Sequence, residues 1–124
     1  MIVGIGLDVV GTDRLRRWYH VQGLLSRFFH RAELETALSR GEAGVLSLAA
    51  RFAAKEAFGK ALGAGLKGFS LKEVAVVNEP SGKPVMHLYG RAEQALKAVG
   101  GTKVFVSLTH ETSYALAMVV IEAE

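Results

Sequence analysis

The stretch RFAAKEAFGKALGAG, residues 51–65, places four charged side chains among alanines and phenylalanines. At 100° per residue, Arg51 and Lys55 lie about 40° apart on a helix, whereas Glu56 and Lys60 lie at about 140° and about 180° from Arg51. The helix therefore has two narrow polar seams on an otherwise apolar surface. A carboxylate removed from water in such a helix needs a cation or a metal as partner. The pattern favours a buried helix in which Glu56 and Lys60 have a function.

Glu56 and Lys60 have a simpler alternative interpretation. A glutamate four residues before a lysine is also a common pair on a solvated helix, where it adds only about 0.2–0.5 kcal/mol. The residues alone leave both interpretations open.

The composition is that of one domain, residues 1–124, with 50% hydrophobic residues and a net charge of +3. This weak positive charge suits an acidic partner or an anionic substrate, but also an ordinary surface. The chain has no cysteine, which excludes disulfides and thiolate metal sites. The first ten residues do not resemble a signal peptide, and no apolar run approaches the roughly 20 residues of a membrane span. We expect a cytoplasmic protein that does not enter a membrane.

The remaining elements follow from apolar periodicity and turn residues. Arg40-Gly41 is expected to end the helix before the long one, and Thr12 or Asp13 to cap the first helix. The pattern predicts an α+β domain with a largely antiparallel sheet packed against the long helix. The expected strands are 2–10, 69–77, 85–90, 103–110 and 113–122, and the expected helices are 14–20, 31–40, about 44–62 and 91–100.

Asp8 is a second isolated carboxylate, in the strand GIGLDVV, residues 4–10. Aspartate is disfavoured in strands, and Gly4 and Gly6 leave room for a backbone or a ligand to approach. The alternative for Asp8 is a residue at the end of a strand that bonds to a nearby turn. Two carboxylates without a cysteine or histidine cluster suit a hard cation such as magnesium, which is commonly completed by water and phosphate oxygens. Cations for such a phosphate are available in Arg51, Lys55, Lys60 and His110.

Four segments in this order resemble the short bacterial-type class of 4'-phosphopantetheinyl transferases, the holo-[acyl-carrier-protein] synthases. They are GIGLDVV (4–10), RFAAKEAFGKALGAG (51–65), SGKP (81–84) and VSLTHETSYALA (106–117). The resemblance covers the whole chain. It implies the fold of that family, a homotrimer with active sites between protomers, and transfer of the 4'-phosphopantetheine arm of coenzyme A to a serine of apo-acyl carrier protein. Adenosine 3',5'-bisphosphate would be released.

The resemblance also implies roles for individual residues. Asp8 and Glu56 would hold the magnesium ion, and Lys60 would face the pyrophosphate of coenzyme A. Glu56, directly or through a water on the metal, would be the general base for the serine hydroxyl. Further contacts with coenzyme A would come from Arg51, Gly63, Gly65, Ser81, Gly82, Lys83, Pro84, Thr109 and His110. For His110 and the two glycines, a plain turn and a plain helix end are the alternatives.

The basic helix near residue 14 resembles the surface with which this family binds its acidic carrier protein. Arg14, Arg17 and Trp18 are the docking candidates, with a solvated basic helix as the alternative. Two positions depart from the family pattern. Gly11-Thr12 stands where an acidic residue is usual, and His30 replaces a threonine. The second departure leaves the capping of the next helix and any role of Glu33 open.

Two other functions compete with the transferase. The chain could be a catalytically silent module that only binds acyl carrier protein, although the presence of Asp8, Glu56 and Lys60 argues against this. It could also be a small basic nucleic-acid binder, but only residues 14–20 combine clustered arginines with aromatic residues. We expect no nucleic-acid partner. Which carrier protein is served, of fatty-acid or polyketide type, and the preference for magnesium over manganese stay open.

Overall fold

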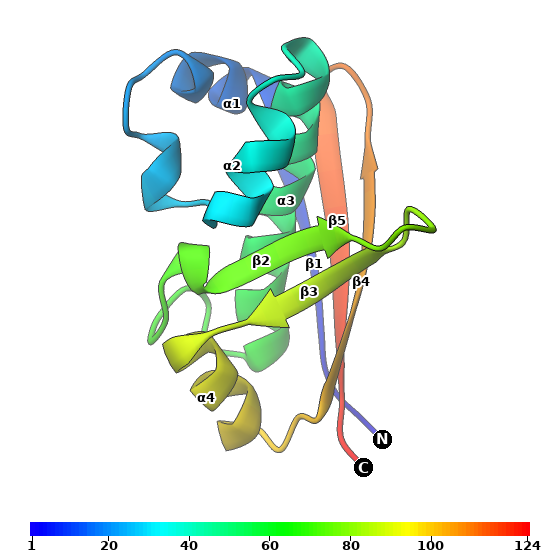
Figure 1. Ribbon diagram of the computed structural model, residues 1–124. Coiled ribbons are helices and arrows are strands. Elements are labelled where there is room, and N and C mark those ends of the chain that lie inside the picture. Colours follow the sequence, from blue (N-terminus) through cyan, green and yellow to red (C-terminus); the bar gives the residue numbers. More distant parts are fainter.

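The computed structural model describes all residues, 1–124, as a long helix held between two antiparallel sheets (Figure 1). The helix, α3 (Glu42–Leu62), lies along one face of a three-stranded sheet in the order β1-β5-β4. A two-stranded sheet, β2-β3, crosses the other side of α3. The expected α+β fold with antiparallel strands is confirmed.

Apart from β2, which begins five residues later than expected, the strands keep within two residues of the expected bounds; α1 and α3 begin two residues earlier than expected, and α2 and α4 end earlier. The chain also contains two short 3₁₀ helices, η1 (Leu25–Arg27) and η2 (Leu71–Glu73). The other elements are β1 (Ile2–Gly11), α1 (Thr12–Tyr19), α2 (Arg31–Ala37), β2 (Val74–Asn78), β3 (Pro84–Leu88), α4 (Gly90–Ala98), β4 (Lys103–His110) and β5 (Tyr114–Glu122).

Three local expectations were wrong. Helix α1 has Gly11 at its N-cap and no side-chain cap; Thr12 is its first residue, and its hydroxyl donates to Thr112 O and accepts from Arg16 Nη1. Helix α2 ends at Ala37, and Gly41 precedes α3 with a positive φ of 56° rather than closing α2. Residues 69–73 are not strand, because Ser70 and Glu73 form a capping box that starts the short helix η2 at Leu71.

Helix α3 approaches β1 closely because the strand has glycines at the contact. A Cβ on Gly4 would lie 2.0 Å from the Ala61 carbonyl oxygen, and one on Gly6 would lie 1.9 Å from that of Ala57. The space left by these glycines is therefore filled by the backbone of α3 rather than by a ligand. The helix ends as expected at Gly63, which adopts the left-handed conformation.

The polar seam of Arg51 and Lys55 faces α2 and β2. The Lys55 ammonium is fully buried and donates to Glu33 Oε1 at 2.7 Å, to Leu71 O at 3.0 Å and to Val74 O. Glu33 Oε2 accepts from Val76 N at 3.0 Å. This buried ion pair is hydrogen-bonded on all sides, and it joins α2, α3 and β2.

His30 caps α2 in place of a threonine. Its Nδ1 accepts from Ala32 N at 3.0 Å, and Glu33 Oε1 accepts from His30 N at 2.9 Å. The structure thus answers the question that the sequence left open at this position. Glu33 completes a capping box and also pairs with Lys55.

The three-stranded sheet leaves its other face uncovered. Residues of alternate register point away from α3, and many of them are large and apolar. The exposed members are Ile5, Leu7, Val9, Phe105, Tyr114 and Met118. We call this surface the outer sheet face. No helix of the chain has both the length and the apolar character needed to cross a membrane.

Candidate active site

Asp8 and Lys60 meet where β1 lies against α3. Lys60 Nζ donates to Asp8 Oδ1 at 2.8 Å and to Leu7 O at 3.0 Å. Asp8 lies on the inner side of β1, the side of Gly4 and Gly6, because side chains alternate along a strand. The side chain of Asp8 is only 11% exposed, whereas that of Lys60 is 54% exposed. A largely buried carboxylate is thus paired with an ammonium that reaches solvent.

Glu56 lies one turn before Lys60 on the same side of α3. Partial burial and, second, the negative charge of Asp8 raise the pKa of Glu56, while Arg14 and Lys60 oppose this effect. The hydrogen bond to Asp8 raises the pKa of Lys60. The sequence therefore predicted correctly that Glu56 and Lys60 form a seam of their own. Asp8 joins them from a strand almost fifty residues away.

Asp8 and Glu56 offer carboxylate oxygens to a hard cation. No group of three histidine, cysteine, aspartate or glutamate side chains gathers anywhere in the chain. Two carboxylates still fit magnesium, which commonly takes one or two carboxylates and completes its shell with water and phosphate oxygens. The raised pKa of Glu56 and the ammonium held at Asp8 both indicate that this cluster attracts positive charge.

Arg51 lies in the other seam and is buried. Its Nε donates to Val76 O at 2.9 Å, Nη1 to Ser47 Oγ at 2.7 Å, and Nη2 to Asn78 Oδ1 at 3.2 Å. Burial lowers the pKa of Arg51. The guanidinium borders a small hollow of about 200 Å³ between α2, α3 and β2. One chain therefore does not bring Arg51 to Glu56.

Lys55 is not available to a phosphate, although the sequence suggested it as a candidate. Its ammonium is fully buried, and its donors are taken by Glu33 and by backbone carbonyls. Burial lowers the pKa of Lys55 despite the nearby carboxylate. A phosphate would have to displace a complete set of partners.

The other candidates for binding coenzyme A lie on three separate surfaces. Gly63 and Gly65 follow α3, both with positive φ. The segment 81–84 forms the turn of the β2–β3 hairpin and the start of β3, and its residues are Ser81, Gly82, Lys83 and Pro84. Thr109 and His110 line a hollow of about 520 Å³ at the end of the outer sheet face, together with Val9, Glu111, Tyr114 and Leu116.

Helix α1 brings its basic side chains to the Glu56 side of the molecule. The Arg14 guanidinium lies 5.9 Å from the centre of the Trp18 ring, and Trp18 stacks on Phe28 at 5.0 Å. Arg14 is also close enough to lower the pKa of Glu56, which the sequence did not predict. Arg17 is exposed and has no ion pair. Trp18 is therefore part of the packing of α1, while Arg14 and Arg17 are open to a partner.

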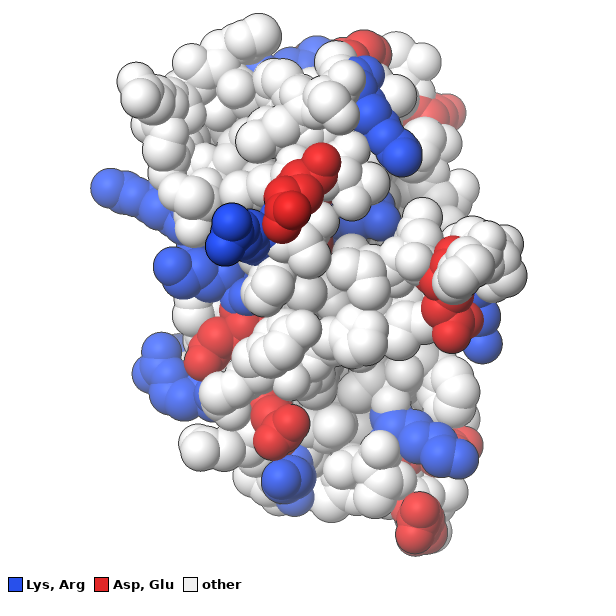
Figure 2. All heavy atoms as spheres, in the orientation of Figure 1, with Lys and Arg blue, Asp and Glu red and all other residues white.

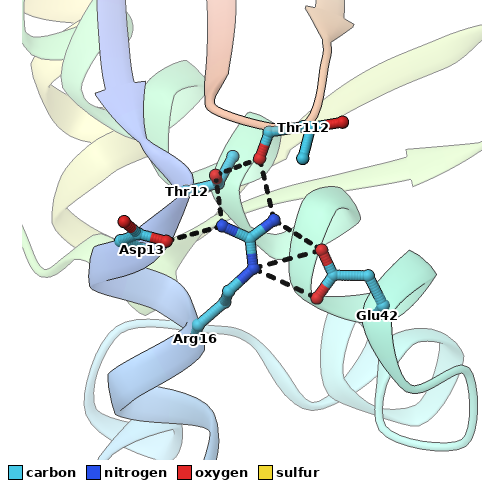
Figure 3. Close-up of polar contacts among 5 residues, drawn as sticks. All are labelled: Thr12, Asp13, Arg16, Glu42 and Thr112. Atoms are coloured by element: carbon cyan, nitrogen blue, oxygen red, sulfur yellow. Dashed lines mark hydrogen bonds and ion pairs between the residues drawn. The ribbon is translucent and has the colours of Figure 1, made fainter.

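Arg16 is the residue of this region that the sequence missed. Figure 3 shows its guanidinium surrounded by acceptors from α1, from the start of α3 and from the turn between β4 and β5. The only sequence signal was its place between the flanking arginines, which does not distinguish an internal from an external role. Elsewhere, on the face seen in Figure 2, basic and acidic side chains are interspersed and form no continuous band of one sign.

Comparisons with known proteins show the family to which the chain belongs. Residues 4–119 match the model of the 4'-phosphopantetheinyl transferase superfamily. A holo-[acyl-carrier-protein] synthase of Treponema denticola is 52% identical over 122 residues, which are 98% of this chain and 99% of that protein.

Solved structures give the same result. The holo-[acyl-carrier-protein] synthase of Neisseria meningitidis superposes with a TM-score of 0.88 at 35% identity, covering 98% of this chain and 99% of that one. The enzyme of Bacillus anthracis, solved in complex with CoA (3',5'-ADP), gives a TM-score of 0.83 at 31% identity, with coverages of 100% and 99%. The chain therefore belongs to the 4'-phosphopantetheinyl transferase superfamily, among the holo-[acyl-carrier-protein] synthases.

Proposed function

We propose that this protein transfers the 4'-phosphopantetheine group of coenzyme A to a serine of apo-acyl carrier protein. The products are holo-acyl carrier protein and adenosine 3',5'-bisphosphate. The serine oxygen forms the new bond to phosphorus, the pyrophosphate bond of coenzyme A breaks, and the serine proton leaves to a base. The observation that carries the proposal is the meeting of Asp8, Glu56 and Lys60 at the contact of β1 with α3.

Asp8 and Glu56 would hold a magnesium ion in this reaction. When bound, the ion neutralises charge on the pyrophosphate, and its partners beyond the two carboxylates would be water and phosphate oxygens. Supporting this, Asp8 is largely buried and already holds a cation, the ammonium of Lys60, at 2.8 Å.

Lys60 would serve the phosphate as a compact positive charge. Phosphoryl transfer depends mainly on positioning and on neutralising the oxygens that gain charge, so an ammonium beside the pyrophosphate lowers the barrier. The Lys60 side chain is about half exposed, and a substrate can therefore reach it. Its pKa is raised, which keeps it charged at neutral pH.

Glu56 is our candidate for the general base. A carboxylate whose pKa lies above its ordinary value accepts a proton more readily than a solvated glutamate. The neighbouring positive charges of Arg14 and Lys60 keep its anionic form accessible.

The remaining contacts with coenzyme A would be shared between copies in a homotrimer. Arg51 and Glu56 leave α3 on different sides, so a neighbouring copy would have to bring Arg51, Thr109 and His110 toward Asp8 and Glu56. The outer sheet face supports such an assembly, because a monomer rarely leaves so many large apolar side chains in water. The glycines 63 and 65 and the turn Ser81–Pro84 would contact the cofactor through the backbone.

Arg14 and Arg17 would bind acidic side chains of the carrier protein, with Trp18 holding the helix in place. Both arginines lie on α1, and Arg14 is near Glu56, so a carrier docked there would present its serine to the site. We further propose that residues 1–124 form a single phosphopantetheinyl transferase domain that works in the cytoplasm.

Mass spectrometry of an apo-carrier protein, incubated with the chain, coenzyme A and magnesium, tests the proposal. We expect a gain of one phosphopantetheine on the serine, lost when a chelator removes the metal and lost in Glu56→Gln. A wild-type chain that binds the carrier but adds no mass would be the silent binding module instead. Transfer at an unchanged rate by Glu56→Gln would exclude Glu56 as ligand and base.

A further inference from the structure

The guanidinium of Arg16 uses all five of its N–H groups within the chain (Figure 3). Nε lies 3.2 and 3.1 Å from the two carboxylate oxygens of Glu42, and Nη2 donates to Glu42 Oε2 and, at 2.8 Å, to Thr112 O. Nη1 donates to Thr12 Oγ1 at 2.9 Å and to Asp13 Oδ1 at 2.7 Å. No donor remains for the carboxylates of a carrier protein. Arg16 therefore bonds only within the chain, whereas Arg14 and Arg17 are open to a partner.

These bonds connect three segments that are distant in sequence. Arg16 belongs to α1, Glu42 is the first residue of α3, and Thr112 lies in the turn between β4 and β5. Thr12 strengthens the last connection, because its backbone N–H donates to Ser113 O at 2.9 Å and its hydroxyl to Thr112 O at 2.5 Å. The same turn begins next to His110, the residue at the end of β4.

Helix α1 needs such an external support. It has eight residues, and its N-cap, Gly11, provides no side-chain cap. A helix of two turns is not stable alone in water, so its position depends on contacts with the rest of the fold. Packing of Leu15 and Trp18 holds one side of α1, and Arg16 holds the side toward the β4–β5 turn.

We propose that Arg16 is a positioning residue that fixes the carrier-docking helix α1 against the turn that follows His110. This inference rests on the proposed function, in which α1 binds the carrier protein and His110 contacts coenzyme A. In the proposed homotrimer His110 serves the site of a neighbouring copy, so Arg16 joins the carrier-binding helix of one site to the coenzyme A contact of the next without touching either substrate. A lysine cannot replace it, because one ammonium cannot reproduce the planar fork that reaches Glu42, Asp13 and Thr112 together.

The decisive variant is Arg16→Met combined with Glu42→Gln, because it removes the network and leaves the net charge unchanged. We expect the KM for the carrier protein and the KM for coenzyme A to rise together, each by about three- to tenfold, with kcat within about twofold of wild type. Arg16→Lys should show most of the same rise. Arg27→Gln is the matched control: it removes one exposed arginine that has no ion pair, and we expect wild-type values.

Salt dependence separates this role from direct binding. A residue that contacts the carrier protein contributes to the decrease of affinity with salt, whereas a positioning residue does not. Arg14→Gln should therefore flatten the dependence of the carrier KM on salt, while Arg16→Met with Glu42→Gln should keep the wild-type slope. A flattened slope in the double variant would mean that Arg16 binds the carrier directly, and the proposal would be wrong.

Hydrogen exchange of the free protein tests the coupling without any activity. The double variant should exchange faster at the amides of residues 12–19 and 111–114, with the β2–β3 hairpin unchanged. Unchanged exchange in both segments, or wild-type KM values for both substrates, would overturn the proposal. A wild-type chain that transfers nothing would instead overturn the proposed function, and the exchange experiment would still decide whether Arg16 couples α1 to the turn.

Discussion

Replacement of Gly6 by alanine should damage both the fold and the site, because the new methyl group meets backbone. The added Cβ would lie 1.9 Å from Ala57 O and 2.9 Å from Ala61 N, whereas ordinary contacts begin at 3.4 Å. Strand and helix must therefore separate by about 1.5 Å at this point, the difference between 3.4 and 1.9 Å. Both partners are main chain, so no side-chain rotation can relieve the clash.

The consequence of that separation is a stability loss of about 1–3 kcal/mol or more, the usual range for overpacking a closely packed interior. Activity should fall further than stability, because Asp8 follows Gly6 by two residues and Lys60 lies on the helix that must move. A displacement of about 1 Å at a phosphoryl-transfer site costs on the order of a hundredfold in rate. Urea unfolding measures the first effect, and phosphopantetheine transfer at saturating substrate measures the second.

Gly11→Ala is the matched control for Gly6→Ala. Gly11 ends the same strand, it has a negative φ, and no atom lies within 4 Å of the position that a Cβ would take. This variant should keep the kcat of the wild type and lose no more than about 1 kcal/mol of stability, because alanine is a poorer N-cap than glycine. If Gly6→Ala were as stable and as active as Gly11→Ala, the close approach of β1 to α3 would not be what places Asp8 beside Lys60.

Three further substitutions probe the charges around α3. Glu56→Gln should be at least as stable as wild type at neutral pH, because the pKa of Glu56 is raised in the folded state and its ionisation therefore favours the unfolded chain. This advantage of the variant should vanish below the ordinary pKa of glutamate. A thermal melt that shows the variant less stable than wild type at pH 7 would contradict the burial argument. Lys55→Met leaves Glu33 buried without its partner and should lower the free energy of unfolding in urea by about 3–5 kcal/mol. The double variant Lys55→Met with Glu33→Gln should recover much of this loss. Equal losses in the single and double variants would mean that the ion pair does not stabilise the fold. Arg14→Glu should raise the KM for the carrier protein more than the KM for coenzyme A, and equal increases would argue against α1 as the docking helix.

The sequence was sufficient for the long helix and for its two seams, because a period of 3.6 residues fixes which side chains share a side whatever surrounds the helix. It also predicted the end of α3 at Gly63, since a left-handed glycine is a local signal. The sequence did not predict which residues pair with the charged side chains of the two seams. Nothing near Lys55 in sequence indicates Glu33, and their pairing depends on where α2 packs.

The errors have the same origin in competition between local and distant partners. Thr12 is a good N-cap by type, but it is the first helical residue, and its hydroxyl donates to Thr112 O, a hundred residues away, and accepts from Arg16 Nη1. Residues 69–73 have the composition of a strand, yet Glu73 accepts from Ser70 N at 2.7 Å and from Arg91 N at 3.0 Å, which draws this segment toward α4. A single sequence does not show whether a polar side chain bonds to a local or to a distant partner.

Lys55 and Glu56 are neighbours on α3 with different roles. The Lys55–Glu33 pair is buried and every polar atom in it has a partner, so this interaction is rigid and leaves nothing for a ligand. In the seam of Glu56 the carboxylate is half-buried, and both its desolvation and the nearby Asp8 disfavour its charged form. An interior organised only for stability would avoid that arrangement. A bound cation relieves both effects at once, and we therefore expect magnesium to raise the melting temperature of the wild type and to have a much smaller effect on Glu56→Gln.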